Sequence, residues 1–318
     1  MAETNGSHPL RILLLDSPRT CSQLFRRLFQ NHPQVDTSVM HLYASPWGFG
    51  PERIALRLKN SPEAQQASID WAEAVPDRAT QTYESALVSF EKTVQDIESQ
   101  GKIPFMKEHN VTLMQQDITL STIRDNEFSN PQHRNPSYLP DSLLLTFSPV
   151  FLIRHPAQMV PSNYRIGASL KKLKLEDEDS MVQTTQRWTR YMWDYLATKS
   201  PAQKPILIDA EDLINNAEAT VLKLCNILGI DPSGVEYSWD AVPKEQWPED
   251  GMGIAKTYLG DLLVSKGVTK SEKGLIDIDV ETEKWAEQYG QEIARALRAR
   301  VDKEMPDYDY LRQFKLTV

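Results

Sequence analysis

Residues 11–25 read RILLLDSPRTCSQLF, and this stretch decides the fold. The apolar run from Arg11 to Asp16 is typical of a central strand in a parallel sheet. A turn follows at Ser17-Pro18, and residues 22–31 place four apolar side chains on one helical face. A strand, a tight turn and a helix form a βα unit, so the stretch predicts the first element of a parallel α/β sheet.

The same alternation continues along the chain. Further strands are predicted at residues 102–107, 149–154 and 205–209. Helices are predicted at 51–60, 77–100, 156–169 and 180–199, from residue 210 to Leu228, and at 281–304. Residues 122–142 lack a sustained period and predict a long surface loop. Strands that alternate with helices predict a three-layer α/β/α fold with a central parallel sheet.

The C-terminal third predicts helices added to this core. We expect a single domain over residues 1–318, with a core at about 10–230 and a helical extension at about 231–318. The helix at 281–304 carries an apolar stripe with a spacing of four residues, made of Trp285, Tyr289, Ile293, Leu297 and Val301. The stripe predicts docking onto the body of the protein, with a homodimer face as the alternative.

Composition excludes several classes of protein. The chain has 318 residues and a formal net charge of -9, which disfavours nucleic acid as a partner but not a small anion in a local pocket. The two cysteines, Cys21 and Cys225, are too few for a disulfide framework and fit a reducing compartment. Neither a signal-peptide core nor an 18-residue apolar run is found, so we expect a cytoplasmic protein without a membrane partner.

In parallel sheets, ligands bind beyond the carboxyl ends of the strands. The first such segment runs into a helix N-terminus, where backbone N–H groups favour an anion, and it adds Arg19, Thr20 and Ser22. The Walker A pattern is absent. The alternative is a capped helix with a surface arginine.

The segment after the third predicted strand carries a second cationic signal. Arg154 ends the strand, and Ser162 lies eight residues later on the following helix. An arginine fork and a serine hydroxyl in this arrangement can converge on one phosphate. The alternative is an arginine paired with a nearby carboxylate.

These segments resemble the sulfotransferase family, which shares the P-loop NTPase-like architecture, and within it fungal sulfotransferase-like proteins. The matching residues occur in the family's order: Pro18, Arg19, Thr20, Ser22 and loosely Gln23 in the 5′-phosphosulfate loop; Lys107 and His109 in K-x-H; Arg154, His155, Pro156 and Ser162 in the 3′-phosphate motif; then Glu211-Asp212-Leu213 and Leu228-Gly229.

The resemblance implies sulfuryl transfer from 3′-phosphoadenosine 5′-phosphosulfate (PAPS) to a hydroxyl or amine of a small-molecule acceptor, in specialised metabolism. His109 would be the general base. Arg19 and Lys107 would stabilise the charge that builds up on the bridging oxygen. No metal is implied. Without the resemblance, the residue type and position of His109 favour a packed or capping histidine.

The chain departs from the family pattern at two places. Cys21 stands where the phosphosulfate loop usually has glycine, which predicts a reshaped loop or a shifted 5′-phosphate. The late R-K-G-x-x-G motif is not recognisable, and Lys266 is the candidate substitute for its phosphate contact. These departures keep two alternatives open: a PAPS-independent enzyme that uses His109 for acid or base chemistry, and a non-catalytic binding protein with a vestigial anion site.

Two features near residue 45 have no clear assignment from the sequence. His41 is predicted to be a packed residue without a chemical role. The aromatic cluster Tyr43, Trp47 and Phe49 fits either an acceptor pocket or ordinary packing under a loop.

Overall fold

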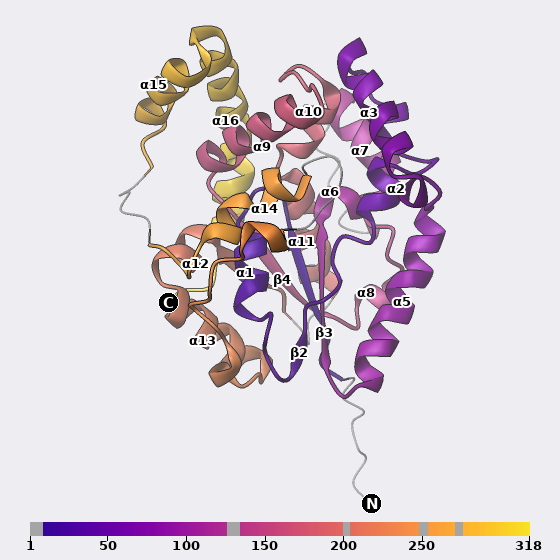
Figure 1. Cartoon of the computed structure of the whole chain (residues 1–318), viewed down its shortest axis with the longest axis vertical. Coiled ribbons are helices and arrows are strands. Elements are labelled where there is room, and N and C mark those ends of the chain that lie inside the picture. Colours follow the sequence, from indigo (N-terminus) through magenta and orange to yellow (C-terminus); the bar gives the residue numbers. More distant parts are fainter. Residues whose placement is uncertain (1–8, 126–133, 200–203, 248–253, 271–275) are drawn as a thin grey trace, which may run out of the picture.

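A parallel sheet of five strands, in the order β2-β3-β1-β4-β5, lies at the centre of the molecule (Figure 1). The structure is a computed structural model and describes residues 9–125, 134–199, 204–247, 254–270 and 276–318. The strands are β1 Ile12–Asp16, β2 Val35–Asp36, β3 Ile103–His109, β4 Ser148–Ile153 and β5 Ile206–Asp209. The four predicted strands are confirmed. The edge strand β2 has only two residues, too few to produce a periodic signal.

Helices connect the strands and extend the chain beyond β5. They are α1 Ser22–Leu28, α2 Ala44–Gly48, α3 Pro62–Ala74, α4 Pro76–Ala79, α5 Tyr83–Ser99, α6 Asn110–Leu113, α7 Gln116–Asp125, α8 Asp141–Leu144, α9 Pro156–Leu170, α10 Glu178–Gln183, α11 Arg187–Lys199, α12 Ala210–Asn215, α13 Ala217–Leu228, α14 Ile254–Val264, α15 Ile278–Tyr289 and α16 Gln291–Arg312. Short 3₁₀ turns occupy Ile54–Leu56, Pro232–Gly234 and Lys244–Gln246. Within the described ranges, no helix combines the length and the apolar character needed to cross a bilayer.

Six predicted segments differ from the structure. The helices predicted at 77–100, at 180–199 and from residue 210 to Leu228 are each divided into two: α4 and α5, α10 and α11, and α12 and α13. The helix predicted at 51–60 is wrong, because only Ile54–Leu56 is helical and Leu56 is 61% exposed, which leaves too narrow an apolar face. The helix predicted at 281–304 is two helices, α15 and α16, which meet at Gly290. In the loop predicted at 122–142, α7 extends to Asp125, residues 126–133 lie outside the described ranges, and α8 follows.

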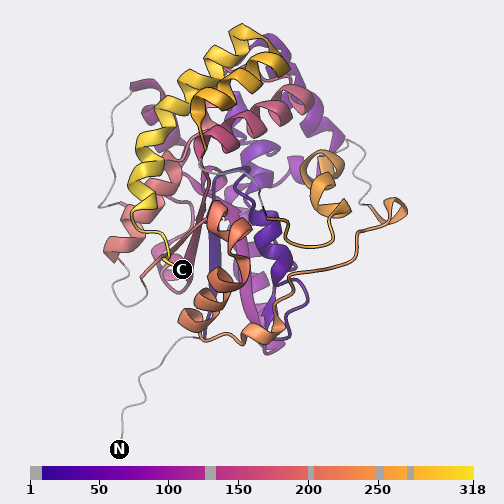
Figure 2. The ribbon, with the colours of Figure 1, turned by 90° about the vertical axis from the view of Figure 1, so that its left-hand side faces the viewer.

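Alternating side chains of the strands supply two hydrophobic clusters, one on each face of the sheet. In β1, Ile12 and Leu14 pack with apolar residues of α1, α12 and α13. Leu13 and Leu15 pack with residues of α5, α8 and α11 and with the C-terminal part of α16. The sheet is therefore covered on both faces, and the predicted three-layer α/β/α architecture is confirmed (Figure 2).

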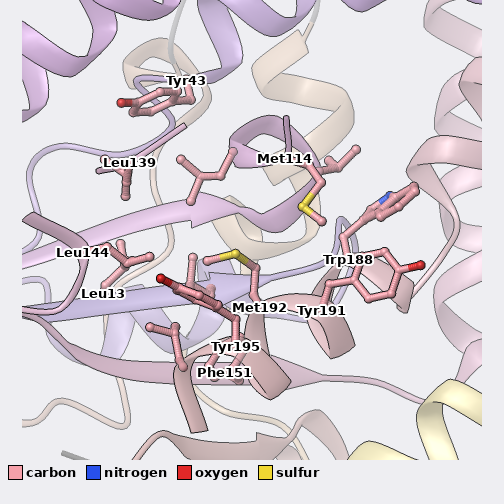
Figure 3. Packing of buried hydrophobic residues seen from close by; sticks show 14 of the residues in the cluster. Leu13, Tyr43, Met114, Leu139, Leu144, Phe151, Trp188, Tyr191, Met192 and Tyr195 are labelled. Atoms are coloured by element: carbon pink, nitrogen blue, oxygen red, sulfur yellow. The ribbon is translucent and has the colours of Figure 1, made fainter. Parts of the chain in front are cut away.

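Aromatic residues of α11 fill the second of these clusters. Trp188, Tyr191 and Tyr195 are each 1% exposed or less, and together with Met192 they pack toward the sheet (Figure 3). Tyr43, Trp47 and Phe49 are also buried, at 0%, 6% and 6% exposure. The packing interpretation of that aromatic cluster is therefore the one that the structure supports.

The C-terminal helices α15 and α16 form a hairpin that lies along α9 (Figures 1 and 2). Trp285, Leu297 and Val301 of the predicted stripe are buried in one cluster with Ala157 and Val160 of α9. Beyond α16, the Leu316 backbone N–H donates to the Leu207 carbonyl of β5 over 2.7 Å. These stripe residues therefore dock onto their own chain, as the sequence predicts.

Candidate active site

The candidate site lies where three neighbouring strands end. In the register of the sheet, Asp16 at the end of β1 is paired with His109 at the end of β3. On the other side of β1, β4 ends at Ile153, directly before Arg154. The strand order thus brings together the segment after β1, the K-x-H residues and the start of α9.

The turn between β1 and α1 has an unusual backbone. Arg19 and Cys21 adopt left-handed conformations, with φ of 72° and 66°. The Thr20 hydroxyl lies 2.9 Å from both a carboxylate oxygen of Asp16 and the Ser17 carbonyl, which holds the turn against the end of β1. Cys21, the residue before α1, therefore keeps the conformation that glycine adopts most easily, and the turn retains it at a cost in strain.

Arginines converge behind this turn. Arg19 Nε donates to Ser162 Oγ over 3.0 Å. Arg154 donates through Nη1 to the Arg19 carbonyl over 3.0 Å and through Nε to Gln158 over 2.9 Å. Burial lowers the pKa of Arg19, and the nearby charges of Arg154 and Arg165 lower it further. Within the described ranges no carboxylate forms an ion pair with these three arginines, so their joint charge favours an anionic ligand.

A cavity of about 430 Å³ opens beside this cluster, a size within the range of small-molecule sites. One wall, formed by α9 and the segment before it, is cationic and polar and includes Arg154, Ser162 and Arg165. The other walls come from α12, α15 and neighbouring loops, and include Glu211, Asn215, Trp285, Gln288 and Tyr289. The cavity can therefore offer an anion site on one side and aromatic, amide and carboxylate groups on the other, the last from Glu211 and Glu281.

His109 forms an oriented pair with Asp16. His109 Nδ1 lies 2.8 Å from Asp16 Oδ1, and Asp16 is fully buried while the His109 side chain is 22% exposed. Burial opposes ionisation of Asp16, but the interaction with His109 and the charge of Lys107 lower its pKa to about 2. Burial lowers the pKa of His109 against the opposing charge of Asp16, which favours a neutral ring. An ionised Asp16 accepts a hydrogen bond from Nδ1–H, so Nε2 of the neutral ring keeps its lone pair and can act as a base.

Lys107 lies behind this pair rather than at a surface. Its side chain has no exposed area, and Nζ lies 2.8 Å from His41 Nε2 and 3.4 Å from Asp16 Oδ1. Burial lowers the pKa of Lys107, and the negative charge of Asp16 works against that effect. The His41 and His109 rings lie 4.3 Å apart between their centres. Lys107 therefore acts on His109 through Asp16 and His41.

The remaining predicted residues lie at different distances from the centre. Pro18 is part of the turn, and the Ser22 side chain is buried at the start of α1. Gln23 donates its amide to the sulfur of Met40 over 3.2 Å. Lys266 is exposed and does not line the cavity, and its carbonyl accepts from the Trp239 backbone.

Asp16 and Arg165 were not assigned a role by the sequence analysis, and His41 was predicted to be a packed residue without one. Asp16 had a usable signal, since it is a charged residue that ends a buried strand. Arg165 follows Ser162 by three residues and so shares its helical face. His41 had no signal, because a loop brings it to β3 through a bridge between Met40 and Lys107.

Known proteins resemble the chain over nearly its full length. Sulfotransferase ppzF of Metarhizium majus (strain ARSEF 297) is 29% identical over 341 positions, which cover 98% of both chains. Sulfotransferase ppzF of Metarhizium rileyi (strain RCEF 4871) is also 29% identical and covers 97% of this chain and 96% of its own. No family profile matches the chain.

Two solved sulfotransferase structures also resemble the chain. The sulfotransferase domain from the curacin biosynthetic pathway covers 88% of this chain and 97% of its own, with 17% identity and a TM-score of 0.42. A sulfotransferase from Alicyclobacillus acidocaldarius covers 80% of this chain and 96% of its own, with 12% identity and a TM-score of 0.43. The full-length sequence similarity confirms the predicted resemblance to fungal members of the sulfotransferase family, and the chain is a sulfotransferase-like enzyme whose reaction the comparisons leave open.

Proposed function

We propose that this enzyme transfers a sulfuryl group from PAPS to a hydroxyl or amine of a small-molecule acceptor. One observation carries the proposal: an arginine–serine anion site and an oriented His–Asp pair lie at the same edge of one sheet. Sulfuryl transfer, like phosphoryl transfer, depends mainly on positioning and on stabilisation of charge. The two free cysteines fit a reaction in the cytoplasm.

The anion site suits the two charged ends of PAPS. Arg154, from the segment between β4 and α9, and Ser162 of α9 line the cavity and would hold the 3′-phosphate. Arg19 comes from the turn after β1 and would lie against the 5′-phosphosulfate, where its guanidinium would stabilise charge on the leaving oxygen. Arg165 adds a cation on the same wall.

His109 would remove the proton from the acceptor. As the acceptor oxygen or nitrogen bonds to sulfur, the bond from sulfur to the bridging oxygen breaks, and its electron pair stays on the phosphate. The acceptor proton passes to Nε2 of His109, and Asp16 stabilises the resulting imidazolium through Nδ1–H. Such base catalysis is worth roughly 10²- to 10⁴-fold in rate.

Calorimetric titration with 3′-phosphoadenosine 5′-phosphate tests the donor site. We expect micromolar binding by the intact chain and about hundredfold weaker binding by Arg154→Ala, on the scale of contacts to charged groups. Arg295→Ala removes an exposed arginine of α16 and serves as the matched control, with unchanged affinity expected. No detectable binding by the intact chain would refute PAPS use.

A transfer assay with PAPS and phenolic, alcoholic and amine acceptors tests the chemistry. His109→Ala should lower kcat by roughly 10²-fold or more while nucleotide affinity is retained. If a metabolite is converted without nucleotide and the conversion requires His109, the chain is a PAPS-independent acid–base enzyme. If nucleotide binds but nothing is converted with any acceptor, the result favours the binding-protein alternative.

A further inference from the structure

His41 is attached to Lys107 at two points. Its backbone N–H donates to the Lys107 carbonyl over 2.8 Å, and its Nε2 lies 2.8 Å from Lys107 Nζ. His41 is also left-handed, with φ of 58°, a conformation that is uncommon for residues other than glycine. A strained backbone at a residue that touches a buried cation and a catalytic candidate points to a role beyond packing.

The contact with Lys107 indicates which ring nitrogen of His41 carries the proton. An ammonium group only donates, so His41 must present the lone pair of Nε2 to Lys107 and carry its own proton on Nδ1. That Nδ1 is buried and has no hydrogen-bond partner among the described residues. Burial and the charge of Lys107 lower the pKa of His41 well below its ordinary value, which agrees with a neutral ring.

Two donors compete for one oxygen of Asp16. His109 Nδ1 approaches Oδ1 to 2.8 Å and Lys107 Nζ approaches the same atom to 3.4 Å. Lys107 has no access to solvent, so His41 is the group that draws its ammonium away from Asp16. Without an acceptor at His41, Lys107 would turn fully to Asp16, and its ammonium would weaken the hydrogen bond that Oδ1 accepts from the Nδ1–H of His109.

We propose that His41 is a positioning residue that holds Lys107 back from Asp16 and thereby keeps His109 in the tautomer with its proton on Nδ1. The catalytic consequence of this arrangement rests on the proposed function, but the tautomer itself does not. A free Nε2 on His109 then depends on a chain of four side chains, in the order His41, Lys107, Asp16 and His109.

Nitrogen-15 NMR of the full chain, labelled at histidine and assigned with His109→Gln, measures the tautomer directly. We expect His109 in the intact chain to carry its proton on Nδ1. His41→Phe keeps the ring and removes the acceptor, so a large fraction of His109 should shift to the Nε2–H form. His41→Gln supplies a new acceptor for Lys107 and should restore the Nδ1–H form.

A matched histidine variant and a second variant at position 41 serve as controls for this test. His32→Phe makes the same change at a buried histidine whose side chain, among the described residues, hydrogen-bonds to the Asp231 carbonyl and the Gln34 backbone N–H, and should leave His109 unchanged. If His41→Phe does not fold, His41→Gly removes the acceptor and adopts the left-handed backbone readily. An unchanged His109 tautomer in a folded His41→Phe or His41→Gly variant would overturn the proposal.

The kinetic readout separates this proposal from the proposed function. If the intact chain transfers a sulfuryl group, His41→Phe should lower kcat about tenfold with KM for PAPS unchanged, and His41→Gln should recover most of the loss. If the intact chain binds no nucleotide, the proposed function fails, whereas the NMR result still decides the role of His41.

Discussion

Arg19 and Ser162 lie 143 residues apart in sequence, and a hydrogen bond of 3.0 Å joins their side chains. The bond links the turn after β1 to α9, which follows β4. Because β1 and β4 are neighbours in the sheet, their carboxyl ends meet, and the two predicted anion motifs become one site. Arg154 strengthens the link by donating to the Arg19 carbonyl.

Ser162→Ala tests whether the serine hydroxyl contacts the ligand or merely supports Arg19. We expect affinity for 3′-phosphoadenosine 5′-phosphate to fall about tenfold, on the scale of one hydrogen bond to a charged group. Ser169→Ala changes an exposed serine of the same helix and should have no effect. Calorimetry gives both values, and equal affinities for the two variants would exclude Ser162 from the site.

The left-handed turn predicts an order of stability at position 21. Cys21→Gly should unfold at the same urea concentration as the intact chain or slightly higher, since relief of strain is offset by the freedom of glycine in the unfolded chain. Cys21→Val should lose about 1–2 kcal/mol, because a branched side chain suits φ of 66° poorly. A valine variant as stable as the intact chain would show that the turn relaxes.

The central strands were predictable because each is a continuous apolar run buried on both faces. Their order in the sheet was not predictable, since nothing local in the sequence states which strands are neighbours. The break at Gly290 was missed because the apolar stripe of α15 resumes on α16 with nearly the same spacing. Only a glycine in the middle of the stripe indicated it.

The candidate site also has a part that the sequence predicts and a part that it does not. Arg19, His109, Arg154 and Ser162 were predictable, since each lies at the end of a strand or in the turn or helix that follows it. Their contacts depend on the strand order, and the position of His41 depends on a loop that a single bridge to Lys107 holds. The burial of Lys107 was not predictable from the sequence either. Lysine is rarely buried without a partner, and the partners of Lys107 come from distant segments.

Glu108 predicts a loss of stability as the pH rises from about 4.5 to about 8. Burial raises the pKa of this carboxyl to about 8, so the folded state binds its proton more tightly than the unfolded state does. The free energy of unfolding that this tighter proton binding adds is fully present below about pH 4.5. It is lost as the pH rises toward 8, at up to about 1.4 kcal/mol per pH unit. Urea unfolding between pH 5 and 9 measures it.

Glu108→Gln should remove that slope, because the amide does not ionise. In the intact chain, the carboxyl oxygens of Glu108 accept hydrogen bonds from the Tyr43 backbone N–H and the Thr112 hydroxyl. The amide oxygen of glutamine can keep the bond from Tyr43. Glu91→Gln, at an exposed position of α5, should keep the slope of the intact chain. Parallel pH profiles for Glu108→Gln and the intact chain would show that Glu108 is ionised in the folded state.

Gly290 separates α15 from α16 with φ of 86° and ψ of 162°, a combination nearly confined to glycine. Gly290→Ala should lower the free energy of unfolding by about 1–3 kcal/mol. A Cβ at this position would meet no atom within 4 Å, so the cost is conformational rather than steric. Because α15 lines the cavity through Trp285 and Tyr289, nucleotide affinity should fall as well.

Gly260→Ala is the control, because a Cβ at this position of α14 also meets no atom within 4 Å. It should leave the free energy of unfolding unchanged or raise it by up to about 1 kcal/mol. If both variants are equally stable, the Gly290 conformation carries no strain for alanine, and the hairpin can adjust without disturbing the cavity.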